Sequence, residues 1–261
     1  MNPHDTLALF DDQMRRHAQP DDPHATLHLT DGVLRQTSTR QGWNGILWSD
    51  LDHTTADTAI ANQISHFAAL GHDFEWKLYA HDQPTDLAQR LLAAGATQEP
   101  TETLMVAAIS DLPTTTPPPD GIHLHPVTDP AGVDLMMQVH QQAFETTATH
   151  IKHRLLTQLA EAPDTVAAVV AMAGTRPVSA ARLDLHPGTH FASLWSGGTV
   201  PDWRGRGIYR ALVAYRARIA AAHGYRYLQV DASDDSRPIL SRLGFTALTT
   251  TTPHLFVVEG L

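Results

Sequence analysis

Residues 122–257 switch repeatedly between the two-residue period of strands and the longer period of amphipathic helices. A strand is expected at 122–127, where IHLHPV alternates. A helix is expected at 129–144, which begins with Asp and Pro and then carries Val133, Met136, Met137 and His140 at helical spacing. The further expected elements, in order, are a helix at 149–163, strands at 165–174, 177–188 and 189–200, a long helix closed by Gly224, a strand at 225–232, a short helix at 235–245, and one or two strands at 247–260. This order predicts the α/β class, as a mixed sheet with helices on both of its faces.

The first part of the chain gives a less regular pattern. Strands are expected at 25–38, 44–51, 75–80 and 102–109, and helices at 55–71 and 86–96. Residues 75–100 and 225–248 share an order of strand, acidic turn, short helix, Gly and strand, which indicates a weak internal duplication.

A proline-rich segment separates the two parts. The stretch SDLPTTTPPPDG, residues 110–121, contains three consecutive prolines, which neither continue a helix nor fit a central strand. We therefore expect a first domain at residues 1–112, a semi-rigid linker at 113–121 and a second domain at 122–261.

Composition narrows the class of protein. The 261 residues carry a formal net charge of −10, contain no cysteine and have no apolar run long enough to span a bilayer. Disulfides and cysteine nucleophiles are thereby excluded, and the acidic balance argues against nucleic-acid and anionic-membrane partners. The start, MNPHDTLALFDD, lacks the basic and apolar regions of a secretory signal, so a soluble cytoplasmic protein is expected.

The turn between the strand at 189–200 and the long helix carries the clearest chemical signal. In TVPDWRGRGIY, Gly205 and Gly207 let the backbone approach a ligand closely, and Arg204 and Arg206 add positive charge. Amide hydrogens at a helix start attract anions, so the turn is a candidate diphosphate site. The spacing fits neither a P-loop nor a dinucleotide-binding motif. An exposed arginine-rich loop remains the simpler alternative for the turn by itself.

The segment VPDWRGRGIYRAL resembles the acyl-CoA-binding motif of the GNAT superfamily of N-acetyltransferases, which reads Arg/Gln-x-x-Gly-x-Gly/Ala after a strand. Arg204, Gly207 and Tyr209 occupy the three positions, and Tyr209 departs from the small residue of the pattern. The element order of 122–257 and the RLGF ending also resemble the family. The first part is similar only to a degenerate copy, as in tandem acetyltransferases. The resemblance therefore implies a GNAT-like fold in two domains.

The resemblance implies acetyl-CoA (coenzyme A) as cofactor, with its pantetheine arm along a strand that splays from 225–232. The residues expected to bind it are Gly198, Thr199, Val200, Arg204, Gly205, Arg206, Gly207, Ile208, Tyr209 and Ser236. The family often protonates the leaving thiolate with a tyrosine at the position that Leu240 takes here. Leucine cannot donate a proton, so water, Ser233 or Ser236 is left for this step, although both serines also suit turn or cap chemistry.

Three carboxylates are candidates for the general base. Glu145 lies between two predicted helices, Asp231 ends a buried strand, and Asp184 lies on a strand with a polar face. A solvated or paired carboxylate is the alternative for each. No metal site is expected, because His150 and His153 lack a third ligand.

Three hypotheses remain open at this stage. The chain is expected to be an N-acetyltransferase that moves an acetyl or other acyl group to the amine of a small molecule or amino acid. Its alternative is a catalytically silent acyl-CoA-binding regulatory or scaffold protein. The third hypothesis is a dimerising or partner-binding protein in which the cofactor cleft is vestigial, so a homodimer is one possible assembly.

Overall fold

The computed structural model describes residues 1–39, 42–144 and 149–258, which fold into two compact units. Unit 1 holds Val106–Val230 and Ile239–Thr246 together with Met1, and unit 2 holds Asn2–Met105, Asp231–Pro238 and Ala247–Leu261. The chain passes between the units within strands β6 (Glu102–Ala108), β11 (Tyr227–Ala232) and β12 (Thr246–Phe256) and within helix α7 (Arg237–Arg242). The division expected at residues 113–121 stays a prediction.

The sheet of unit 1 runs in the order β7-β8-β9-β10-β11. Its strands are β7 (Ile122–Val127), β8 (Val166–Ala173), β9 (Arg176–Leu185), β10 (Phe191–Thr199) and β11. Neighbouring strands from β7 to β10 are antiparallel, and β10 pairs with β11 in parallel. The strand order and the helices between the strands confirm the mixed α/β class expected from the sequence.

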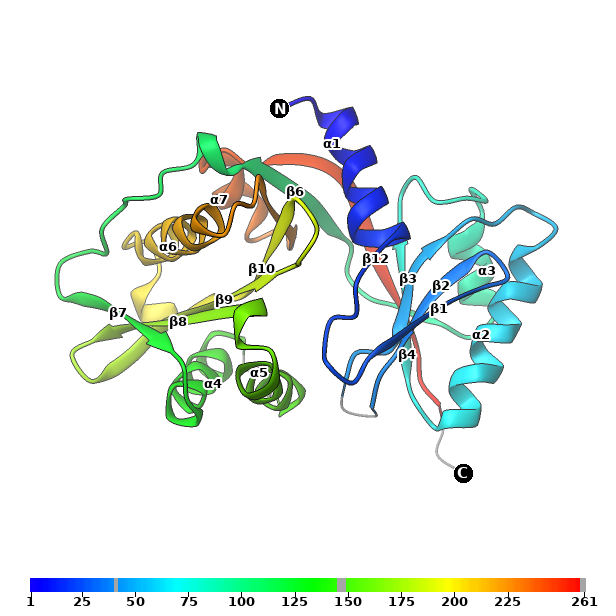
Figure 1. The fold of residues 1–261 in the computed structure, drawn as a ribbon, viewed down its shortest axis with the longest axis horizontal. Coiled ribbons are helices and arrows are strands. Elements are labelled where there is room, and N and C mark those ends of the chain that lie inside the picture. Colours follow the sequence, from blue (N-terminus) through cyan, green and yellow to red (C-terminus); the bar gives the residue numbers. More distant parts are fainter. Residues whose placement is uncertain (40–41, 145–148, 259–261) are drawn as a thin grey trace. The chain divides into compact units, whose positions relative to one another are not determined.

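Helices cover both faces of this sheet, as Figure 1 shows. On one face lie α4 (Pro130–Phe144) and α5 (Thr149–Glu161), and on the other lies α6 (Ile208–Ala222). The face under α4 packs Val133, Met136 and Val139 against Val170 and Ala180. The opposite face packs Ile208 and Leu212 against β8 and β9. The helical spacing at 129–144 therefore identifies the buried face of α4. Val133 and Met136 lie at the centre of this face, and Met137 and His140 lie at its edge, where they are half-buried.

Unit 2 is built on strands in the order β1-β2-β3-β4-β12-β6. The first four are β1 (Thr26–Thr30), β2 (Val33–Thr37), β3 (Gly45–Ser49) and β4 (Phe74–Tyr79), and the two-residue β5 (Thr97–Gln98) pairs with β12. Strands β3 and β4 are parallel, whereas β4 and β12 are antiparallel with Phe74 opposite Phe256. The last strand of the chain thus completes a sheet of the first part of the chain.

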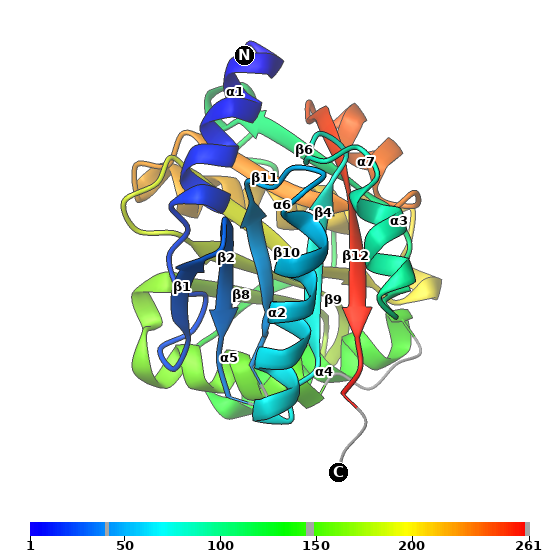
Figure 2. The same cartoon turned by 90° about the vertical axis from the view of Figure 1, so that its right-hand side faces the viewer.

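Helices α2 (Ala56–Leu70) and α3 (Leu87–Ala93) cover one face of these strands, and Figure 2 shows α2 in front of β4 and α3 beside β12. Phe67 of α2 stacks on Phe74, which in turn stacks on Phe256. Trp76 and Leu91 are buried in the same cluster. This aromatic stack therefore packs β12, from the end of the chain, into one core with α2 and β4 from its first part.

The N-terminal helix was missed by the sequence analysis. Helix α1 (Pro3–Phe10) continues into a π-helical segment, η1 (Asp11–Arg16). Its signal was present, because the Asn2 side chain caps the helix by accepting from the His4 N–H and Pro3 takes the first position. Single-turn helices complete the elements: η2 (Ile109–Asp111), η3 (Pro163–Thr165) and η4 (Pro201–Trp203). None of the helices described is both long and apolar enough to cross a bilayer.

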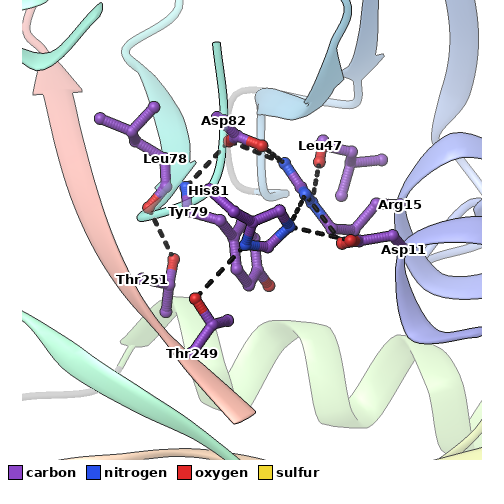
Figure 3. A network of polar contacts seen from close by, with 9 residues as sticks. All are labelled: Asp11, Arg15, Leu47, Leu78, Tyr79, His81, Asp82, Thr249 and Thr251. Atoms are coloured by element: carbon purple, nitrogen blue, oxygen red, sulfur yellow. Dashed lines mark hydrogen bonds and ion pairs between the residues drawn. The ribbon is translucent and has the colours of Figure 1, made fainter. Parts of the chain in front are cut away.

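Arg15 fastens η1 to the strands of unit 2, as Figure 3 shows. Its guanidinium binds Asp82 through both carboxylate oxygens at 2.7 and 2.8 Å, Asp11 at 2.8 Å and the Leu47 carbonyl at 3.2 Å. The same group lies 4.0 Å from the centre of the Tyr79 ring. With 3% of its surface exposed, Arg15 is a buried cation whose donors are largely satisfied, which indicates a structural role.

Candidate functional site

Strand β10 changes course at its end. Its pairing with β11 covers Phe191 to Ser193 only, so the two strands diverge beyond Ser193. Its register with β9 shifts between Trp195 and Gly198, and Ser196 takes a left-handed φ of 50°. A bulge of this kind redirects backbone groups away from ordinary ladder bonds. The divergence expected for an arm lying between these strands is thus present.

The turn after β10 leads directly into α6. Gly205 and Gly207 have φ values of 72° and 82°, which disfavour side chains, and Gly207 is the cap residue of α6. No side chain caps this helix start. A Cβ at Gly205 would have no neighbour within 4 Å, and one at Gly207 would meet only Pro119 at 3.9 Å. The helix start therefore lies open to a ligand, and its amide hydrogens suit an anion.

The two arginines of the turn have different surroundings. Arg204 donates to the carbonyls of Thr199 and Ala143, each at 3.1 Å, so it ties the end of β10 to the end of α4. Arg206 lies 4.6 Å from the centre of the Trp203 ring. Both arginines are exposed, but Arg204 already donates to two carbonyls, so Arg206 is the better candidate of the two for an anion contact.

Tyr209 packs against the bulge from the α6 side. A Cβ built on Gly197 would lie 3.0 Å from Cε2 of Tyr209, so glycine permits this approach. Beside Tyr209 lies the buried Arg216, which donates to the carbonyls of Leu212 and Arg182 at 3.1 and 3.2 Å. Burial lowers the pKa of Arg216, while Tyr209 acts in the opposite direction. The Tyr209 ring therefore fills the space between α6 and Gly197 that would stay empty with the Gly or Ala of the family motif.

The helical spacing of the sequence predicts one apolar stripe on α6, made of Ile208, Leu212, Tyr215, Ile219 and Ala222, and this prediction is only partly right. Ile208 and Leu212 are buried, but Tyr215 and Ile219 are half-buried and Ala222 is exposed. The buried row instead continues through Arg216 and Ala220. The reason is that α6 packs along an i, i+4 ridge, and a hydrophobicity pattern gives no weight to an arginine on it.

On the other face of the bulge, α4 forms a shallow pocket with β9 and β10. Its lining residues are Met136, Met137, Val139, His140, Phe144, Ala180, Ser196 and Gly198. His140 and Phe144 were not among the candidate site residues. The signal for His140 was its place on an otherwise apolar helix face.

Buried polar groups lie deeper in unit 1. Asp184 binds Arg182 at 2.9 Å and Arg154 at 3.4 Å, and only 3% of the residue is exposed, so it is a paired carboxylate. His186 and Ser193 are hydrogen-bonded at 2.7 Å, and Gln229 donates to the same hydroxyl. Burial lowers the pKa of His186 to about 4, so its ring is neutral near pH 7.

Three candidate residues belong to unit 2. Asp231 forms an ion pair with Lys77, and its side chain is 3% exposed. Burial and the Asp231 charge raise the pKa of nearby Glu102 to about 7. Ser233 and Ser236 share a local turn, in which the Ser236 hydroxyl donates to the Ser233 carbonyl at 3.2 Å. These contacts match the turn and pairing alternatives that the sequence left open.

The remaining candidate residues fall into those that lie together at the end of β10 and the start of α6, and those that do not. Unit 1 brings Gly198, Thr199, Val200 and the segment 204–209 together at the bulge and the start of α6. Leu240 is fully buried, and Glu145 lies outside the described residues. Lys77, Glu102 and Arg216 were missed, since their contacts join residues far apart in sequence.

Comparison with known proteins agrees with this geometry. Residues 133–245 match the family model described as acetyltransferase (GNAT) family. A GCN5-related N-acetyltransferase from Kribbella flavida is 17% identical, with a TM-score of 0.69 over 99% of this chain and 95% of that chain. A tandem GNAT protein from the clavulanic acid biosynthesis pathway is 12% identical, with a TM-score of 0.59 over 93% of this chain and 86% of that chain.

A functionally unknown conserved protein from Staphylococcus epidermidis has a TM-score of 0.69 at 11% identity, over 93% of this chain and 96% of that chain. Among curated protein sequences no match was found. The match to the GNAT acetyltransferase family model covers residues 133–245, and this span includes the turn at 204–209 that resembles the family's motif. The fold of solved GNAT proteins extends over both parts of the chain.

Proposed function

We propose that the chain is an N-acetyltransferase that moves an acetyl or other acyl group from acyl-CoA, with acetyl-CoA as the usual donor, to the amine of a small molecule or amino acid. The observation that carries the proposal is the uncapped start of α6 at left-handed Gly207, directly after a bulged strand that leaves its neighbour. The match of residues 133–245 to the GNAT family model supports it.

Each part of the site has a role in this proposal. The amide hydrogens at the start of α6 hold the diphosphate, and Arg206 adds a charge-assisted contact. Backbone groups of Gly198 to Val200 orient the pantetheine arm. When bound, acetyl-CoA supplies a thioester that is open to attack by an amine. Holding both reactants in one geometry provides much of the rate enhancement.

The chain has no tyrosine at the family's usual position for protonating the leaving group, because Leu240 takes it and is fully buried. A thiol has an ordinary pKa of about 8.5, so its anion is a tolerable leaving group near neutral pH. We therefore expect the leaving thiolate to take its proton from water.

The first part of the chain is proposed to be a degenerate GNAT-like copy. The tandem GNAT protein named above matches across 93% of this chain. Strand β4, helix α3 and strand β6 repeat the order of β11, α7 and β12. The copy lacks a glycine-rich turn, since residues 46–55, which lead from β3 into α2, contain no glycine. Cofactor binding is accordingly assigned to the second part.

Calorimetry with coenzyme A tests binding, and thiol release from acetyl-CoA with a panel of amines tests transfer. The panel holds polyamines, amino sugars, aminoglycosides and free amino acids. Binding together with amine-dependent thiol release supports the enzyme. Binding without release by any amine favours the silent acyl-CoA-binding alternative. No heat with coenzyme A, and no rise in the thermal midpoint, refutes both.

A further inference from the structure

Among the residues that the structure describes, the pocket on the α4 face of the bulge is lined by one ionisable side chain, His140. Its lining is otherwise apolar or small, with Met136, Met137 and Phe144 from α4 facing Ala180, Ser196 and Gly198. His140 projects from the same helix into this lining. An imidazole therefore lies at the bulge of β10, on the face of the sheet opposite α6.

Packing fixes His140 against the strand. Its ring lies 4.8 Å from the ring of Phe144, centre to centre. Phe144 in turn covers Gly198 so closely that a Cβ there would lie 2.7 Å from Cε2 of the phenyl ring. Arg204 binds the Ala143 carbonyl at 3.1 Å and so holds the end of α4 at β10. The imidazole is thus positioned by α4, β10 and the turn together.

The surroundings of His140 favour its neutral form. Burial lowers the pKa of His140, and His150 on α5 lowers it further. Arg204 adds a further positive charge at this end of α4, while the described lining residues from β9 and β10 are Ala180, Ser196 and Gly198, which do not titrate. A neutral imidazole has one ring nitrogen with a lone pair and is a competent proton acceptor at pH 7.

We propose that His140 is the general base of the transfer, a role that rests on the proposed function. A ring nitrogen of His140 accepts the proton that the acceptor nitrogen loses as its lone pair forms the bond to the acyl carbon. The C–S bond of the donor breaks in the same transfer, and its electron pair leaves on sulfur as the coenzyme A thiolate. This assignment places the acceptor amine on the α4 face of the bulge.

The test compares His140→Gln with His125→Gln, an exposed histidine on β7 of the same unit. Steady-state rates are measured from pH 5 to 9 with acetyl-CoA and the amine that gives the highest rate in the panel above. His140→Gln is expected to lower kcat/KM for the amine about 100-fold or more, within the range of general-base catalysis. His125→Gln is expected to keep the wild-type rate, and calorimetry should give both variants wild-type affinity for coenzyme A.

The pH dependence of the rate is a second measurement, and it would not change if His140 only packed against its neighbours. The base works when deprotonated, so wild-type activity should rise with pH through the His140 pKa, with a midpoint below the ordinary histidine value of about 6.5. NMR titration of the His140 ring, identified by the signal absent from His140→Gln, should give the same midpoint. The variant should lose this acidic limb, and added imidazole should restore part of the rate in His140→Ala.

Three results would overturn the assignment: a His140→Gln enzyme within threefold of wild type, an unchanged acidic limb in that variant, or an NMR midpoint that differs from the kinetic one. The NMR comparison uses the kinetics of the wild-type protein and therefore holds even where a variant folds poorly. Failure of the proposed function is distinguishable, because it shows as absent coenzyme A binding or absent turnover in the wild type.

Discussion

Substituting each arginine of the turn by alanine, first of all Arg206→Ala, distinguishes the role of Arg206 from that of Arg204. The Arg204 guanidinium donates hydrogen bonds to the carbonyls of Thr199 and Ala143, whereas Arg206 lies over Trp203 at the open start of α6. We therefore expect Arg206 to contact the diphosphate and Arg204 to hold the turn in shape. Removal of each should leave a different signature.

The magnitude follows from the contacts. A hydrogen bond to a charged group contributes about 1.5–3 kcal/mol, and the exposure of Arg206 favours the lower end. Arg206→Ala should thus weaken coenzyme A binding about 10- to 30-fold and leave the free energy of unfolding nearly unchanged. Arg204→Ala removes two hydrogen bonds within the protein, so it should lower the free energy of unfolding by about 1–2 kcal/mol.

Calorimetry with coenzyme A at two salt concentrations and urea unfolding measure the two effects separately. Arg218→Ala is the matched control, because Arg218 is an exposed arginine on α6 that lies over Tyr215 at 5.3 Å. It removes the same charge farther along the helix. Wild-type affinity in Arg206→Ala, or an equal loss in Arg218→Ala, would refute the assignment of Arg206 to the diphosphate.

Three further predictions concern stability and the helix start. Arg15→Met should lower the free energy of unfolding by about 3–5 kcal/mol in urea, because it leaves Asp82 buried without its cation; Arg16→Met, which removes an exposed arginine over Trp48, should cost under about 1 kcal/mol. Gly207→Val forces a side chain to a φ of 82°, so it should reduce coenzyme A affinity in calorimetry at least 10-fold, and wild-type affinity would contradict the close approach of a ligand. His186 has a pKa of about 4 in the folded protein and about 6.5 unfolded, so the unfolded state binds its proton first as pH falls. Between pH 6.5 and 4 the free energy of unfolding should therefore decrease by about 3 kcal/mol from this group, a loss that urea titrations should not find in His186→Gln.

The helix start at Gly207 was predictable from the sequence because its determinants are local. A strand, a turn with two glycines and an amphipathic helix follow one another within some thirty residues, and backbone sterics alone select glycine at left-handed positions. The same holds for most strands and helices, whose periods follow from burial of one face. Candidate cofactor-binding residues of the second part could be proposed from the sequence for this reason.

Chemistry that depends on distant contacts could not be predicted in this way. Asp231 was proposed as a general base from its position at a strand end and Ser233 as a proton donor, and only the structure shows that Asp231 pairs with Lys77 and that Ser233 belongs to a local turn. Lys77 lies 154 residues from its partner. A hydrophobic pattern also treats His140 as one more position on the face of α4.

The sequence by itself determined the order of elements and the location of the glycine-rich turn, because both follow from interactions among neighbours along the chain. Tertiary structure alone decided that β12 joins the sheet of the first part, that Arg204 binds two carbonyls, and which ionisable groups are paired or buried. Burial and pairing set the charge of a side chain, and both depend on atoms that the fold brings together from distant parts of the chain.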